Sequence, residues 1–146
     1  MQVDFYHLTA QFLDRVLPQI AEKVLASGDR LLIVVEDADD RARLDRHLWT
    51  YSPESFLAHA QAGAADDAGQ PILLAPDLNA ANGARNVALA DGIWRPDALD
   101  FDRAIHFFDK ARIRDARAAW KLLKDRDGVE PRYWKQNDAG RWEQAA

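Results

Sequence analysis

The chain has 146 residues, of which 48% are hydrophobic and 29% are charged, with a formal net charge of −5 and no cysteine. This length is typical of one domain with a sizeable core, and the lack of cysteine excludes disulfides, thiolate metal sites and cysteine nucleophiles. The sequence shows neither the pattern of a signal peptide nor an apolar run long enough to span a membrane. We therefore expect a single cytoplasmic domain over residues 1–146 that makes no contact with a membrane.

The first half of the chain alternates short apolar runs with segments of helical periodicity. Residues 3–8 predict a strand, and residues 9–28 predict a helix in which apolar side chains recur every four positions. Residues 30–36, RLLIVVE, form the nearly continuous apolar run that is typical of a strand covered on both faces. Clustered acids at the start of residues 37–51 favour a second helix, because carboxylates stabilise the positive end of the helix dipole.

The second half repeats this alternation after a loop. Glycine, alanine and aspartate in residues 61–70 predict a mobile loop. Three further strands are predicted at residues 71–76, 86–90 and 103–109. Residues 110–126 predict a long helix, and the aromatic segment at residues 129–146 predicts a strap packed on the body of the domain.

This order of elements predicts an α/β fold. Strands that alternate with helices favour a three-layer, mainly parallel sheet of five strands with helices on both faces, similar to Rossmann folds. Such sheets often bind nucleotides at the carboxyl ends of their strands. The seven glycines, however, form neither a dinucleotide-binding motif nor a P-loop, so we expect no nucleotide site and no cofactor.

The sequence offers one candidate for metal-dependent chemistry. Glu36, Asp37 and Asp39 follow the second predicted strand, where carboxylates could hold a divalent cation in a nuclease or phosphatase. The alternative is that Asp37 or Asp39 caps the following helix. No histidine or serine lies in a recognised catalytic spacing, so the residues favour a binding module over an enzyme.

The helix predicted at residues 110–126 is the most distinctive feature of the charge distribution. It holds seven basic residues against two acidic ones, a net charge of +5, so the rest of the chain carries −5 − 5 = −10. At about 100° per residue, its apolar side chains form one stripe, with a basic stripe directly beside it that consists of Arg114, Arg117, Lys121 and Lys124.

Trp120 lies on the seam between the two stripes. An indole beside a guanidinium suits a ligand that combines an apolar ring with carboxylates. Two alternatives remain open at this point. Trp120 could be an ordinary core residue that the neighbouring lysines cover, or the basic helix could bind single-stranded DNA directly, although the −10 charge elsewhere disfavours a long polyanion.

A second candidate surface surrounds the Ser-Pro turn after the second predicted helix. Trp49, Tyr51 and Phe56 are three aromatic residues close together in the sequence. They either fix the turn to the core or form an exposed apolar patch for a partner protein.

Several segments, in order, resemble a known family. These are FYHL, GDRLLIVVED, LDRHLWTYSPESFLAHA, QPILL and ARAAWK, and the most specific is the pattern LD..LW...P.SF..H. Together they are similar to the chi subunit of bacterial DNA polymerase III holoenzyme. The resemblance implies a non-catalytic replication accessory protein with a Rossmann-like fold that lacks a nucleotide.

The resemblance also implies partners and site residues. Chi proteins bind the acidic C-terminal tail of single-stranded DNA-binding protein, which ends in proline and phenylalanine with a free carboxylate, so contact with DNA is only indirect. Arg117 matches the arginine that holds this carboxylate, Trp120 replaces an aromatic residue, usually tyrosine, that lines the phenylalanine pocket, and Lys121 matches a neighbouring lysine. Arg114 and Lys124 are added from helix geometry alone.

Chi proteins also bind the psi subunit, which joins them to the clamp loader. Trp49 and Phe56 match aromatic residues on the psi-facing surface, and Tyr51 lies beside them in the sequence. The chain has Ala58 where the family often has proline, and its C-terminal strap at residues 129–146 differs from the best-known members. The expected partner of this surface is therefore a psi subunit or a helicase-like protein.

Overall fold

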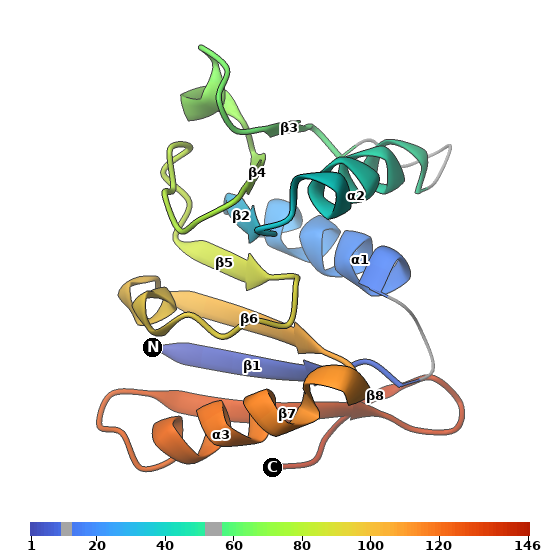
Figure 1. Cartoon of the computed structure of the whole chain (residues 1–146), viewed down its shortest axis with the longest axis vertical. Helices are drawn as coiled ribbons and strands as arrows, with labels where there is room; N and C mark the ends of the chain where they lie inside the picture. The colour runs from blue at the N-terminus through green and yellow to red at the C-terminus, as the bar shows by residue number, and fades with distance from the viewer. Residues whose placement is uncertain (10–12, 52–56) are drawn as a thin grey trace.

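The computed structural model describes residues 1–9, 13–51 and 57–146 of the chain, which form a sheet with helices beside it (Figure 1). The strands are β1 (Gln2–His7), β2 (Leu31–Val34), β3 (His59–Gln61), β4 (Ile72–Ala75), β5 (Asn86–Leu89), β6 (Arg103–Phe108), β7 (Glu130–Gln136) and β8 (Trp142–Gln144). The α-helices are α1 (Leu13–Ala26), α2 (Ala38–Thr50) and α3 (Ile113–Leu123), and short 3₁₀ turns are η1 (Asp67–Gly69), η2 (Pro96–Asp100) and η3 (Lys110–Arg112). Within the described ranges, each helix is too short or too polar to cross a membrane.

The strands form one sheet in the order β3-β4-β2-β5-β6-β1-β7-β8. Its pairs are parallel except for β7 with β8, which is antiparallel. The α/β class and the five predicted strands are confirmed, the latter as β1, β2, β4, β5 and β6. The predicted strand number is wrong, because the described residues contain eight strands.

The three additional strands lack the apolar runs that mark buried strands. β3 and β8 have three residues each, too few for a period to show. β7 has the sequence EPRYWKQ, in which charged residues and a proline interrupt the aromatic side chains. The segment that was predicted as a strap thus forms β7 and β8 at one edge of the sheet, where a proline is tolerated.

Helices pack against both faces of the sheet. α1 and α2 contribute buried residues to a core cluster with β2, β4 and β6, whereas α3 contributes to a cluster on the opposite face with β1, β2 and β5. Every residue of β2 and β4 is buried, which explains their continuous apolar sequences. In Figure 1, α3 (orange) lies over β7 and beside β1, away from α1 and α2.

The predicted helix over residues 110–126 begins with a tighter turn. Asp109 Oδ1 accepts a hydrogen bond from the Ala111 amide at 3.0 Å, and η3 then leads into α3. The helix ends at Leu123, earlier than predicted. Gly128 has a φ of +78°, a left-handed conformation that turns the chain into β7 and returns it beside α3.

A buried carboxylate joins the strands that carry α3. Asp4 on β1 is fully buried, and its oxygens accept hydrogen bonds from Arg103 on β6 at 2.8 Å and from the Trp134 indole on β7 at 3.0 Å. Gln2 donates a further hydrogen bond to Asp4 at 2.8 Å. Since a buried charge is tolerated only when it is paired and hydrogen-bonded, this cluster fixes β1 between β6 and β7.

His106 on β6 lies among aromatic rings on the α3 side of the sheet. It is fully buried, with ring centroids 5.5 Å from Phe5, 5.7 Å from Trp94 and 5.9 Å from Phe108. Neither ring nitrogen has a hydrogen-bond partner within the described part of the chain. Burial lowers the pKa of His106 to about 4, so the native ring is neutral at pH 7.

This burial predicts a specific loss of stability in acid. The pKa of His106 is about 4 in the folded protein and 6.5 in the unfolded chain, so the unfolded chain takes up the proton first. The free energy of unfolding is therefore unaffected by this ring above pH 6.5 and decreases as the pH falls from 6.5 towards 4. At pH 4.5 the loss due to this ring is expected to be between about 2 and 3 kcal/mol. Urea unfolding of wild type and His106→Phe between pH 7 and pH 4.5 measures it. The variant is expected to lose less stability over this range, and equal losses would contradict the prediction.

Candidate functional site

The orientation of α3 is set by its apolar side. Ala116, Ala119 and Leu123 are buried against the sheet, and Trp120 is partly buried. The Trp120 ring packs edge-on against Phe5 at 5.5 Å and against Tyr133 at 6.0 Å between ring centroids. Trp120 is therefore a packing residue that still exposes part of its surface.

The basic side of α3 faces solvent. Arg114, Arg117, Lys121 and Lys124 are all exposed, and none of them forms an ion pair with an acid in the described ranges. By contrast, Arg112 at the start of the helix lies 3.5 Å from the Asp115 carboxylate. The predicted apolar and basic stripes are thus both present on α3, and the basic one is exposed.

Two residues of β7 that were not predicted from the sequence extend this surface. Tyr133 and Lys135 are two positions apart on the strand, so their side chains lie on the same face of the sheet as α3. Burial raises the pKa of Tyr133, and the Arg117 guanidinium partly opposes that rise. Only a prediction of β7 as a strand could have revealed this pair, through its period of two.

The second predicted surface is only partly described. Trp49 lies near the end of α2 with 51% of its surface exposed, and its ring centroid is 4.3 Å from that of His59. Tyr51 is partly buried against the core cluster of α1 and α2. Phe56 lies outside the described residues, so the structure does not place it beside Trp49.

The acidic cluster after β2 does not have the geometry of a metal site. Asp37 is the N-cap of α2, and its Oδ2 accepts a hydrogen bond from the Asp40 amide at 2.9 Å. In the described ranges, no three acidic or histidine side chains converge on a point where they could hold a metal ion. The alternative of a nuclease or phosphatase that uses Glu36, Asp37 and Asp39 therefore lacks its metal-binding group.

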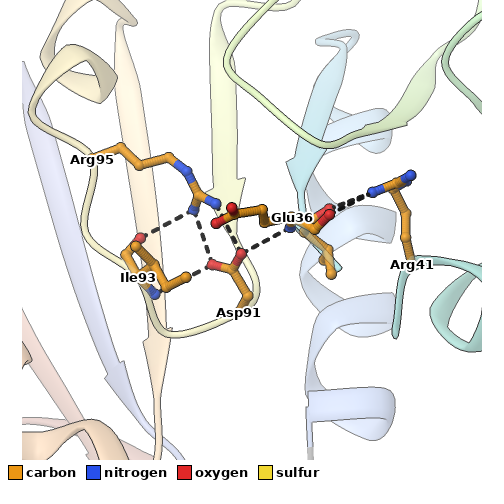
Figure 2. A network of polar contacts seen from close by, with 6 residues as sticks. Glu36, Arg41, Asp91, Ile93 and Arg95 are labelled. Atoms are coloured by element: carbon orange, nitrogen blue, oxygen red, sulfur yellow. Dashed lines mark hydrogen bonds and ion pairs between the residues drawn. The ribbon is translucent and has the colours of Figure 1, made fainter. Parts of the chain in front are cut away.

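The ends of β2 and β5 are instead fastened together by a polar network (Figure 2). Asp91, just after β5, accepts two hydrogen bonds from Arg95 at 2.9 and 2.8 Å and one from the Glu36 amide at 3.0 Å. Arg41 donates to the backbone carbonyl of Glu36 at 3.1 Å, which ties α2 to the same point. Burial alone would raise the pKa of Asp91, but the hydrogen bonds from Arg95 and Glu36 lower it overall.

A cavity of about 470 Å³ lies near this network at the carboxyl ends of the strands. Its polar lining includes Arg43, His47 and four carboxylates, which belong to Asp14, Asp40, Asp91 and Asp109. Ligands of open α/β sheets commonly bind at this position, but an acidic lining repels a phosphate group. The cavity is therefore unfavourable for a nucleotide.

Comparison with known proteins identifies the family. Residues 1–130 match the family model described as DNA polymerase III chi subunit, HolC. The chain belongs to the chi family. The family is a replication accessory subunit of the polymerase, which agrees with the prediction that the protein is not itself an enzyme.

Two curated relatives carry the same designation. The chain is 28% identical over 83 residues to the probable DNA polymerase III subunit chi of Rickettsia prowazekii (strain Madrid E). The aligned region covers 57% of this chain and 50% of that protein. It is 31% identical over 78 residues to the DNA polymerase III subunit chi of Escherichia coli (strain K12). That aligned region covers 53% of this chain and 53% of the relative. The chain thus spans about half the length of the curated relatives it matches.

The chi-family match ends where β7 begins. Tyr133 and Lys135, which complete the basic surface of α3, lie beyond residue 130 and outside the matched region. The surface therefore combines a helix within the family match and a strand outside it.

The packing of α3 predicts different stability costs for two neighbouring residues. Trp120→Ala is expected to lower the free energy of unfolding by about 2 to 3 kcal/mol, because it removes the contacts with Phe5 and Tyr133. Arg117→Ala is expected to change it by less than about 0.5 kcal/mol, because this side chain is exposed. Urea unfolding of both variants tests this difference, which a large cost at Arg117 or no cost at Trp120 would contradict.

Proposed function

We propose that this chi-family chain binds the acidic C-terminal tail of single-stranded DNA-binding protein on the surface formed by α3 and β7. The observation that carries the proposal is the row of four exposed cations, without ion-pair partners among the described residues, on the same helix as a partly exposed indole. The remainder of the chain is acidic, so a short acidic segment can bind this surface while a long polyanion is repelled. Binding of the tail would tether the polymerase to DNA that is coated by single-stranded DNA-binding protein.

Each part of the surface suits a part of such a tail. The planar Arg117 guanidinium can hold a terminal carboxylate through two parallel hydrogen bonds. The exposed edge of Trp120, with Tyr133 beside it, offers apolar area for a terminal phenylalanine ring. Arg114, Lys121 and Lys124 surround these groups and can attract the acidic residues that precede the ring.

The contact is expected to be weak and exchangeable. A short disordered tail loses conformational entropy on binding, so an affinity of about 1 μM, or roughly −8 kcal/mol, is reasonable. Exposed charges are screened by salt, so affinity decreases as ionic strength rises. Several tails on one coated strand raise the effective concentration, which allows weak contacts to hold the complex and still exchange.

We propose a second function for the surface around Trp49, namely docking of a protein partner. The supporting observation is the 51% exposure of this large apolar side chain near the end of α2. The partner is a psi subunit that leads to the clamp loader, or a helicase-like protein. Phe56 and Tyr51 are the aromatic residues proposed to accompany Trp49.

The tail proposal predicts the effect of one substitution. Arg117→Ala is expected to weaken binding of a synthetic tail peptide about 10-fold to 100-fold, because a charge-assisted hydrogen bond contributes about 1.5 to 3 kcal/mol. Isothermal titration calorimetry measures this, with Arg15→Ala as the matched control, since Arg15 is also exposed but lies on α1. Equal affinities of wild type and Arg117→Ala would refute the proposal. Tight binding of a bare oligonucleotide would instead favour direct recognition of DNA.

The docking proposal is tested separately. Replacement of both Trp49 and Phe56 with alanine is expected to abolish capture of a purified psi or helicase-like partner from the same organism. Arg117→Ala is expected to retain that partner, since it lies on a different helix. Retention of the partner by the double variant would show that the aromatic residues around α2 have only a structural role.

A further inference from the structure

His7 lies directly beneath the surface formed by α3 and β7. It is the last residue of β1, 8% exposed, and its ring is stacked on Phe108 with centroids 4.9 Å apart. Its Nδ1 is 3.1 Å from the hydroxyl of Tyr133, a hydrogen-bond distance. Because Tyr133 also contacts Trp120, this tyrosine alone separates the histidine from the partly exposed indole.

The charged groups that face His7 come from three segments packed around it. Burial lowers the pKa of His7, and the charges of Lys135 on β7 and Arg117 on α3 lower it further. The carboxylate of Asp109, just after β6, raises the pKa of His7 but does not reverse this shift. In the free protein at neutral pH, the ring is therefore neutral.

The neutral ring determines what the Tyr133 hydroxyl can do. A phenol is a stronger acid than the N–H of neutral imidazole, and an imidazole nitrogen is the stronger base, so the hydroxyl donates its proton to Nδ1 of His7. The hydroxyl then has no proton left to donate to a ligand carboxylate. When His7 is protonated, Nδ1–H becomes the donor, the Tyr133 oxygen accepts, and the hydroxyl proton is free to point elsewhere.

We propose that His7 is a positioning residue for peptide recognition, which frees the Tyr133 hydroxyl to donate to a carboxylate of an acidic peptide when His7 takes up a proton. This inference rests on the proposed function and adds a dependence on pH to it. The bound carboxylates offset the positive charges of Arg117 and Lys135, so the peptide favours the protonated ring. By linkage, protonation of His7 favours the peptide to the same extent.

The expected pH dependence follows from the sign of this coupling. Peptide binding raises the pKa of His7 above its value in the free protein, so affinity increases as the pH falls through the interval between these two values. The peptide carboxylates remain ionised at pH 5.5, because their ordinary pKa values are about 4. We expect binding to be at least about threefold tighter at pH 5.5 than at pH 8.

The experiment is a calorimetric titration of an acidic tail peptide between pH 5.5 and pH 8 at constant ionic strength. His7→Gln cannot be protonated, so it is expected to show a nearly flat pH profile. Tyr133→Phe lacks the hydroxyl but keeps the His7 ring and its coupling to charge, so it is expected to retain only part of the wild-type pH dependence. His47→Gln on α2 is the matched control and is expected to keep the wild-type profile. Circular dichroism checks folding, and two variants at different positions keep the test available when one of them is unstable.

The outcomes separate this inference from the one on which it rests. Wild-type binding that does not change with pH, or a wild-type pH dependence that persists in His7→Gln, overturns the role of His7 and leaves the tail site intact. A pH dependence of Tyr133→Phe equal to that of wild type overturns the role of the hydroxyl. A wild type that binds no peptide at any pH overturns the proposed function itself. NMR titration of the His7 ring gives a further readout, because its pKa is expected to rise when peptide is added.

Discussion

The edge-on packing of Trp120 against Phe5 and Tyr133 determines how the molecule presents its positive charge. The indole fixes α3 across β1 and β7, and the small residues Ala116 and Ala119 allow the helix to approach the sheet closely. Because the apolar side of α3 packs on the sheet, the basic residues, which lie further around the helix axis, face solvent. A helix rotated by half a turn would bury four cations, which is costly unless each of them is paired.

The strands beneath this helix must be held firmly for the arrangement to persist. Asp4 supplies that restraint from the opposite face of the sheet, where it joins β1 to β6 and β7 through Arg103 and Trp134. At the carboxyl ends of β2 and β5, the hydrogen bonds of Asp91 fasten the loops that enzymes of similar topology often use for ligands. The site proposed for this chi-family chain is therefore on a helix and on β7, the strand next to the edge of the sheet, away from the usual ligand position of an α/β sheet.

The sequence predicted the parts of this structure that depend on local pattern. Continuous apolar runs revealed the buried strands, and the 100° periodicity of residues 113–124 gave both stripes of α3. β7 was missed because charged residues and a proline interrupt its aromatic side chains, so it has no apolar run. The contributions of His7, Tyr133 and Lys135 could not be predicted, because they depend on the parallel pairing of β1 with β7, whose residues are more than 120 positions apart in the chain.

The central claim is that an acidic tail is bound by α3 and β7 together. It is tested most directly by an amide and indole NMR titration of the isotope-labelled protein with a synthetic tail peptide. The account predicts that the largest shift changes occur at the Trp120 indole and at the amides of Arg117, Lys121, Tyr133 and Lys135. Changes confined to α2, or spread evenly over the surface, would contradict it.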